Sequence, residues 1–203
     1  MLKYKIVLAG SKDVGKSSLI ARFVDGMFDS NMMDTIGVAF KRKKMLIDEN
    51  RELDLTIWDF GGEEKYRALF PQYIQGASAA LILFDTTRED TLDDIENWMN
   101  IIDSNAQENI VKVLIGSKID LKDERKISVD MAKKFIKKFN CYGDPLGTSS
   151  KTGENVELAF KKVAEGIINV QLQRCTSCGE IFSRKLKHCN YCGADAEVTA
   201  ITS

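Results

Sequence analysis

Proline, histidine and long apolar runs are scarce in this chain of 203 residues, which has two prolines, 14 glycines and one histidine. So few prolines and glycines argue against a collagen-like or disordered chain. No apolar run reaches the roughly 18 residues that a membrane-spanning helix needs. The first residues, MLKYKIVLAG, turn polar too soon for a signal peptide. We therefore expect a soluble, cytoplasmic protein, which protein partners can hold at a membrane surface.

An excess of charge of one sign is also lacking. The 29 Lys and Arg residues stand against 30 Asp and Glu, so the formal net charge is −1. This balance gives no global electrostatic argument for binding nucleic acid or an anionic membrane. Hydrophobic residues make up 44% of the chain, which is enough for a sizeable core. The length suits one α/β domain with a small appendage, and we expect a monomer.

Short apolar runs alternate with amphipathic stretches from residue 3 to about 170. The apolar runs are Tyr4–Ala9, Leu53–Trp58, Ala79–Phe84 and Val111–Ile115, and the helix-like stretches lie near Lys16–Val24, Thr91–Asp103, Val129–Phe139 and Asn155–Gln173. This alternation predicts an α/β fold, with a mostly parallel sheet covered by helices on both faces. Lys41–Ile47 and Glu52–Asp59 flank a polar turn and are expected to pair as an antiparallel hairpin.

A phosphate-binding pattern follows the first predicted strand. Gly10–Ser17, GSKDVGKS, fits G-x4-G-K-[ST] and opens a predicted helix. In that context the backbone N–H groups point at phosphate oxygens, Lys16 reaches the β- and γ-phosphates, and the Ser17 hydroxyl binds Mg²⁺. The alternative is a glycine-bearing turn that matches the pattern by chance. We expect the phosphates to be bound by Asp13, Val14, Gly15, Lys16, Ser17 and Ser18.

Two later loops bear on the choice of base. Ser117–Asp120, SKID, follows the Val111–Ile115 run, at the edge of the sheet where ligands bind in such folds. A carboxylate there can accept from both the ring N–H and the amine of guanine, a donor pair that adenine lacks. The alternative is an ordinary loop with a helix-capping Asp. Thr148–Gly153 is a second loop that can close over the base.

These motifs, in this order and spacing, resemble those of the Ras-superfamily small GTPases, and most closely the Rab branch. The similarity covers about residues 3 to 170. Further segments that carry it are Asp34–Phe40, similar to the first switch, Ile57–Glu64, similar to the second switch, Phe84–Arg88 and Thr148–Thr152. The resemblance implies a P-loop fold that binds GTP or GDP with Mg²⁺. In such proteins the γ-phosphate orders both switches and hydrolysis releases them.

The resemblance also implies roles for single residues. Thr35 would bind Mg²⁺ and sense the γ-phosphate, Asp59 would hold Mg²⁺ through water, and the Gly62 amide would contact the γ-phosphate. The implied catalytic set is Lys16, Thr35, Gly62 and Glu63. Around the base, the implied contacts are those of Phe28, Ser117, Lys118, Asp120, Ser149, Ser150 and Lys151.

Two residues depart from the family in ways that bear on catalysis. Glu63 stands where the Rab pattern has glutamine, whose amide orients the attacking water. A carboxylate could act as a base, but its repulsion from the γ-phosphate, a few kcal/mol in order of magnitude, favours slow turnover. Lys12 replaces a small residue; it could block an activating arginine, pair with Glu63, neutralise charge, or point to solvent.

Two further departures concern the base-binding region. Ser117 replaces the usual asparagine, and Pro145 with Gly147 makes an edge strand before the last loop uncertain. We expect nucleotide selectivity to survive both. The chain is thus expected to be a Mg²⁺-dependent switch that hydrolyses GTP to GDP slowly and meets effector, exchange and activating proteins through its switch loops. The alternative is a GTP-binding scaffold with negligible hydrolysis.

Four of the five cysteines fall near the C-terminus, in two C-x2-C-G knuckles. They are Cys175, Cys178, Cys189 and Cys192. Four thiolates in this spacing are typical of a zinc ribbon, a closed structural Zn²⁺ site. The alternatives are a redox dithiol pair and an iron centre. We expect a G domain over residues 1–170 and a ribbon module with a short tail over residues 171–203, its core being 175–193.

The role of the ribbon is less constrained by the sequence. Arg184, Lys185 and Lys187 lie between the knuckles, but the module has a net charge of only +1, so nucleic acid is not the expected partner. We expect the ribbon to dock a protein, with a nucleic-acid adaptor as the alternative. The chain ends in TAITS, without a prenylation motif. We therefore expect protein docking to replace lipid targeting, in a role related to vesicle trafficking or signalling.

Overall fold

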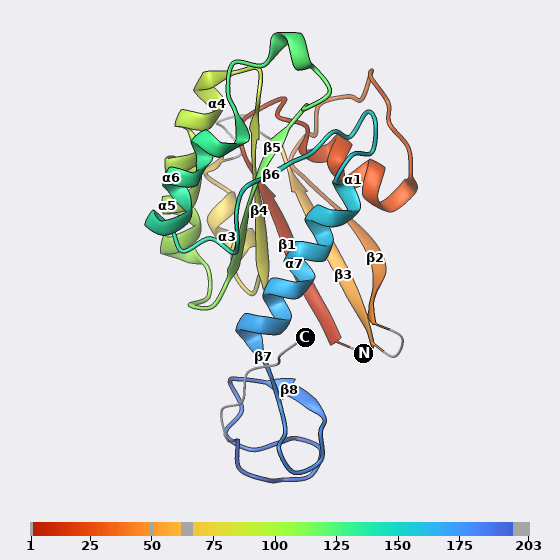
Figure 1. Cartoon of the computed structure of the whole chain (residues 1–203), viewed down its shortest axis with the longest axis vertical. Coiled ribbons are helices and arrows are strands. Elements are labelled where there is room, and N and C mark those ends of the chain that lie inside the picture. The colour runs from red at the N-terminus through yellow and green to blue at the C-terminus, as the bar shows by residue number, and fades with distance from the viewer. Residues whose placement is uncertain (1, 49–50, 62–66, 197–203) are drawn as a thin grey trace.

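The computed structural model describes residues 2–48, 51–61 and 67–196. Six strands form one twisted sheet in the order β2-β3-β1-β4-β5-β6 (Figure 1). They are β1 (Leu2–Ala9), β2 (Val38–Asp48), β3 (Arg51–Phe60), β4 (Ala79–Asp85), β5 (Val111–Ser117) and β6 (Leu146–Gly147). All neighbours pair in parallel except β2 and β3, which form an antiparallel hairpin. The predicted fold class and hairpin are confirmed.

Helices cover both faces of the sheet (Figure 1). They are α1 (Lys16–Asp25), α3 (Phe70–Ile74), α4 (Glu89–Asp93), α5 (Ile95–Asn105), α6 (Lys133–Lys138) and α7 (Val156–Gln171). Because successive strand residues point to opposite faces, Ile6 and Leu8 pack toward α1 and α7, whereas Val7 and Ala9 pack toward α3, α5 and α6. Strands β4 and β5 are buried along their whole length. Their apolar sequences reflect this two-sided burial.

The structure divides several expected elements differently. The stretch near Thr91–Asp103 forms two helices, α4 and α5, with Asp94 between them. The stretch near Val129–Phe139 forms a 3-10 turn, Val129–Ala132, followed by the short helix α6. The uncertain edge before the last base-binding loop is β6, a strand of two residues. Among the described residues, no helix has the length and apolar character needed to cross a bilayer.

A second sheet of two strands follows helix α7 without a linker. Strand β7 (Leu172–Arg174) pairs antiparallel with β8 (Ile181–Ser183), beyond the end of the main sheet (Figure 1). The Gln171 side-chain amide donates to the carbonyls of Ser78 and Asn109, at 2.7 and 2.9 Å. Leu172 is also buried. These contacts hold the start of the cysteine-rich segment against the larger part of the molecule, and the Lys185 ammonium group adds a bond to Gln107 Oε1 at 2.7 Å.

Candidate functional site

The loop between β1 and α1 wraps around the N-terminus of the helix. Gly10 lies at φ 140°, and a Cβ there would stand 2.4 Å from the Leu83 carbonyl oxygen, so only glycine fits. Lys16 is buried and donates to the carbonyls of Gly10 and Ser11, at 2.7 and 2.8 Å. Burial lowers the pKa of Lys16 to about 8. The unpaired N–H groups at the start of α1 and this lysine make the loop suitable for an anion.

Three oxygen atoms from separate parts of the chain meet beside this loop. The Ser17 hydroxyl lies 2.7 Å from Thr35 Oγ1 and 2.5 Å from Asp59 Oδ2, and Thr35 Oγ1 lies 3.0 Å from Asp59 Oδ2. Burial raises the pKa of Asp59, and its other oxygen, Oδ1, is buried without a hydrogen-bond partner in the described part of the chain. Hard oxygen ligands around a buried carboxylate suit a divalent cation such as Mg²⁺.

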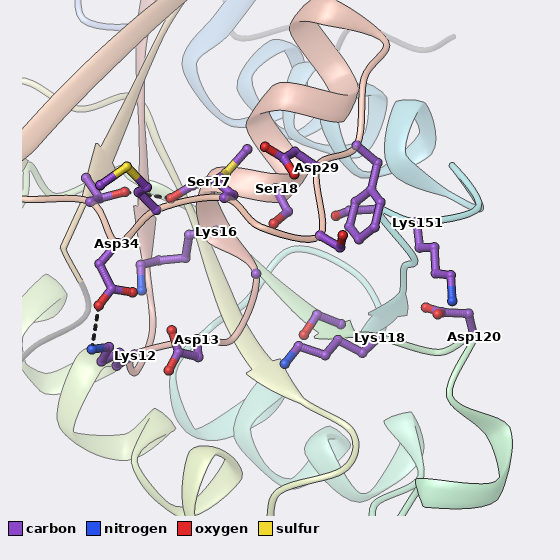
Figure 2. A pocket seen from close by; sticks show the side chains of 18 of the residues that line it. Lys12, Asp13, Lys16, Ser17, Ser18, Asp29, Asp34, Lys118, Asp120 and Lys151 are labelled. Carbon is purple, nitrogen blue, oxygen red and sulfur yellow. Dashed lines mark hydrogen bonds and ion pairs between the residues drawn. The ribbon is translucent and has the colours of Figure 1, made fainter.

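A cavity of about 340 Å³ opens beside these groups (Figure 2). Most of the predicted nucleotide-binding residues line it: Asp13, Gly15, Lys16, Ser17, Ser18, Phe28, Thr35, Ser117, Lys118, Asp120, Ser150 and Lys151. Val14 is not among them because its side chain packs in the core. Ser149 is fully buried and is also absent from the lining. Gly62 and Glu63 lie outside the described residues.

The far end of the cavity is built by two loops that hold each other. The Ser149 hydroxyl donates to Asp120 Oδ1 at 2.6 Å, which fixes one carboxylate oxygen and leaves Oδ2 for a ligand. Lys118 extends along the cavity (Figure 2). Its ammonium group pairs with Asp85 at 2.7 Å. Phe28 lines the cavity and is 37% exposed. An aromatic ring, a carboxylate and a lysine stem suit a flat, hydrogen-bonding base.

Lys12 has a partner that the sequence did not indicate. Its ammonium group lies 2.7 Å from Asp34 Oδ2, so the phosphate loop is joined to the first switch next to Thr35 (Figure 2). Lys12 also lines the cavity. The predicted alternative of a lysine pointing only to solvent is therefore wrong. Its pairing with Glu63 stays a prediction, since Glu63 is not described.

Two supporting residues have no role assigned from the sequence. Arg22, on α1, donates to the carbonyls of Ser150 and Lys151, both at 2.6 Å, and so fixes the last base-binding loop. The Thr86 hydroxyl donates to the Ser117 carbonyl at 2.9 Å. These contacts join residues that are far apart in the sequence, so no local spacing could have indicated them.

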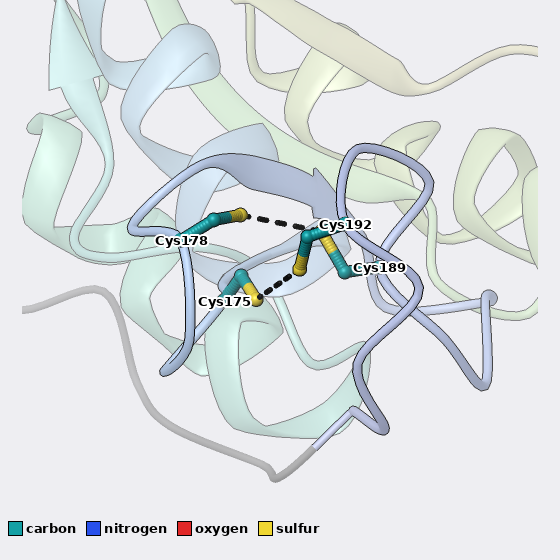
Figure 3. A group of neighbouring side chains, drawn as sticks. All are labelled: Cys175, Cys178, Cys189 and Cys192. Carbon is teal, nitrogen blue, oxygen red and sulfur yellow. Dashed lines mark hydrogen bonds between the residues drawn. The ribbon is translucent and has the colours of Figure 1, made fainter.

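The four clustered cysteines converge on one point (Figure 3). Their sulfur atoms all lie within 4.8 Å of one another, with Cys175 and Cys192 3.6 Å apart and Cys178 and Cys189 3.7 Å apart. These distances are too long for disulfides and match the roughly 3.8 Å between thiolates of a tetrahedral zinc site. N–H groups of Cys178 and Ser177 donate to the Cys175 sulfur and lower the pKa of that thiol.

The two knuckles have the same backbone structure. Gly179 and Gly193 lie at φ 77° and 78°, and each donates its N–H to the carbonyl of the first cysteine of its knuckle. Such conformations favour glycine. His188 is exposed and pairs with Asp195 at 2.7 Å, as expected for a residue that is not a ligand. The donor set therefore fits a closed metal site.

Comparison with known proteins agrees with this geometry. The sequence model of the Ras family matches residues 5–169. Ras-related protein Rab-18-B of Danio rerio is 41% identical over 165 residues, which are 81% of this chain and 78% of the relative. Ras-related protein RABA4a of Arabidopsis thaliana is 37% identical over 87% of this chain and 77% of the relative. Ras-related protein Rab-1 of Theileria parva is 39% identical over 81% of this chain and 74% of the relative.

The matched region contains the phosphate loop, the three converging oxygens and both base-binding loops. The relatives are all named as Ras-related, and their identities of 37–41% extend over most of this chain. The chain belongs to the Ras family and is a Rab-like small GTPase, a switch that binds GTP and hydrolyses it.

Proposed function

We propose that the chain is a Mg²⁺-dependent guanine-nucleotide switch with slow intrinsic hydrolysis, which carries a structural zinc ribbon for docking a protein. The observation that carries this proposal is the convergence of Ser17, Thr35 and Asp59 beside the buried Lys16. Thr35 belongs to the first switch, so a cation at this point couples the conformation of that switch to the bound nucleotide.

In this proposal Ser17, Thr35 and Asp59 hold Mg²⁺, which neutralises charge on the β- and γ-phosphates. The Lys16 ammonium group has three N–H donors, of which two contact the carbonyls of Gly10 and Ser11, and the third would donate to the phosphates. The backbone N–H groups of residues 13–18 would donate to the remaining phosphate oxygens. Val14 would contact the phosphates through its backbone N–H, because its side chain packs in the core. Gly62 is assigned its γ-phosphate contact from the sequence alone.

Guanine selection is assigned to Asp120. Its Oδ1, which also accepts from Ser149, and its Oδ2 would accept from the ring N–H and the amine of guanine. Ser149 acts by holding this carboxylate, because its hydroxyl already donates to Asp120. Phe28 and the Lys118 stem flank the base, and Ser117, Ser150 and Lys151 complete the pocket. Adenine would leave the carboxylate facing a ring nitrogen without a proton, which is costly for a carboxylate that the base shields from water.

Slow hydrolysis is assigned to Glu63, which places a carboxylate where an amide would orient water. Lys12 would add a cation near the γ-phosphate, and its pair with Asp34 would help keep the first switch over the nucleotide. The pair is half exposed, so its own contribution to stability is below about 1 kcal/mol. Effector, exchange and activating proteins would bind at the two switches, in a role related to vesicle trafficking.

For the C-terminal part, we propose a division at residue 170. Residues 1–170 would form the G domain and residues 171–203 the ribbon module, with Cys175, Cys178, Cys189 and Cys192 holding Zn²⁺. The small apolar cluster of Cys175, Phe182 and Cys189 is separate from the two larger clusters of the sheet. So small a core requires the metal for its stability. The ribbon would dock a protein partner.

The first prediction concerns pH. Because the folded, ligand-free protein has a Lys16 pKa of about 8, raising the pH above 8 removes the charge that binds phosphate. The affinity for GDP should fall about fivefold between pH 8 and pH 9 and change little between pH 6.5 and pH 7.5, and Lys16→Met should lose this dependence. Calorimetric titration with GDP measures both. An equally steep dependence in Lys16→Met would contradict the assignment.

The second prediction concerns hydrolysis. Glu63→Gln should raise the single-turnover rate constant of preloaded Mg²⁺·GTP by about tenfold or more, since it restores the amide and removes a negative charge. Lys12→Gly, alone and combined with Glu63→Gln, tests their coupling: a product of single effects means that the residues act independently. A wild-type rate at or above that of Glu63→Gln would show that Glu63 assists catalysis. Stable GTP in all variants would favour the scaffold.

The third prediction concerns the ribbon. Metal analysis of the purified protein should find one zinc per chain, and Cys178→Ser and Cys192→Ser should each lose it, because three thiolates bind zinc more weakly. Cys141→Ala, which changes a thiol in the main core, is the matched control and should keep it. Iron with its visible absorption, or a chain free of metal but with unchanged thermal stability, would contradict the zinc assignment.

A further inference from the structure

One carboxylate receives hydrogen bonds from three different parts of the molecule. Asp94 lies between helices α4 and α5, and its side chain is 17% exposed. The Arg67 guanidinium donates to both of its oxygens, at 3.0 and 2.5 Å, and the Ser11 hydroxyl donates to Oδ2 at 2.7 Å. The indole N–H of Trp98 and the amide of Asn97 add bonds of 2.9 and 3.0 Å.

The Ser11 end of this network leads directly to the phosphate loop. While the hydroxyl of Ser11 donates to Asp94, its carbonyl accepts from the ammonium group of Lys16 at 2.8 Å. A single residue thus connects Asp94 with the buried lysine of the site. Any displacement of Asp94 moves the Ser11 peptide, and with it an acceptor that orients Lys16.

The Arg67 end leads to the second switch. Arg67 follows the second-switch motif by three residues and comes just before helix α3. Its guanidinium also lies over the Trp98 indole, 4.5 Å from the ring centre, so a cation–π contact supplements the two-bond ion pair. The end of the second switch is therefore anchored to α5 through a pair of groups that are mostly buried.

We propose that Asp94 is a positioning residue that couples the second switch, through Arg67, to the phosphate-binding lysine, through Ser11. The proposal rests on the proposed function, since it assigns Lys16 to the nucleotide phosphates. When Arg67 is held, the Ser11 peptide and Lys16 are held as well, and the bound nucleotide leaves slowly. When the second switch is pulled away by a partner, the same chain of contacts loosens the phosphate loop.

The test uses the full chain loaded with Mg²⁺·GDP, and compares Asp94→Asn, Ser11→Ala and the double variant. Asp94→Asn should release GDP about five- to twentyfold faster, because the amide is neutral and replaces one of the two acceptor oxygens that Arg67 and Ser11 use with an NH2 donor. Ser11→Ala should give a smaller acceleration. Since Ser11 acts through Asp94, the double variant should match Asp94→Asn rather than the product of both effects. Thermal unfolding of each variant is recorded beside the release rate.

Asp93→Asn is the matched control, because Asp93 is the exposed neighbour of Asp94. It should release GDP at the wild-type rate. A lower melting temperature in Asp94→Asn and Ser11→Ala with unchanged release rates would show a merely structural role and overturn the inference, and so would multiplicative effects in the double variant. If the wild type retained no guanine nucleotide at all, the proposed function would fail instead, which is a distinguishable outcome.

Discussion

The arrangement of the molecule depends on a buried carboxylate, Asp59, that the protein does not satisfy by itself. One oxygen contacts Ser17 and Thr35, and the other has no partner among the described residues. A buried charge of this kind costs several kcal/mol unless a cation compensates it. The nearby Lys16 is buried as well, with its ammonium group on loop carbonyls. A divalent cation and an anionic phosphate together would compensate both groups, which is why the two ligands are expected to bind together.

The fold explains how these groups meet. Parallel strands end at the same edge of the sheet, so Lys16 and Asp120, which follow β1 and β5, line one cavity. Asp59, near the end of β3, lies beside that cavity through its contact with Ser17. Helices on both faces bury the central strands β4 and β5 along their whole length. The cysteine-rich segment follows α7, and Figure 1 shows it beyond the end of the sheet that bears the start of β1. A partner on the ribbon would therefore leave the switches accessible.

Much of this site could be predicted from the sequence because its chemistry is local. The phosphate loop combines glycine and lysine at fixed spacing, and each cysteine knuckle is a turn of five residues. The strands were recognised from continuous apolar runs, which two-sided burial explains. The break between α4 and α5 was missed, because the amphipathic pattern continues across Asp94 while its side chain is drawn into long-range contacts.

Long-range side-chain contacts were the part that could not be predicted. The pair of Lys12 with Asp34 spans a loop whose course no periodicity defines. Arg22 reaches a loop 128 residues away. Such contacts depend on the three-dimensional path of the backbone, and one arginine on a helix resembles any other in the sequence.

The most direct measurement is the affinity for GDP with and without Mg²⁺, in the wild type, in Asp59→Asn and in the same-strand control Asp54→Asn. If Asp59 holds the cation, removing Mg²⁺ weakens binding about tenfold or more in the wild type and in Asp54→Asn, and has little effect in Asp59→Asn. A wild-type affinity that ignores Mg²⁺, or an Asp59→Asn variant that responds to it like the wild type, would contradict the account.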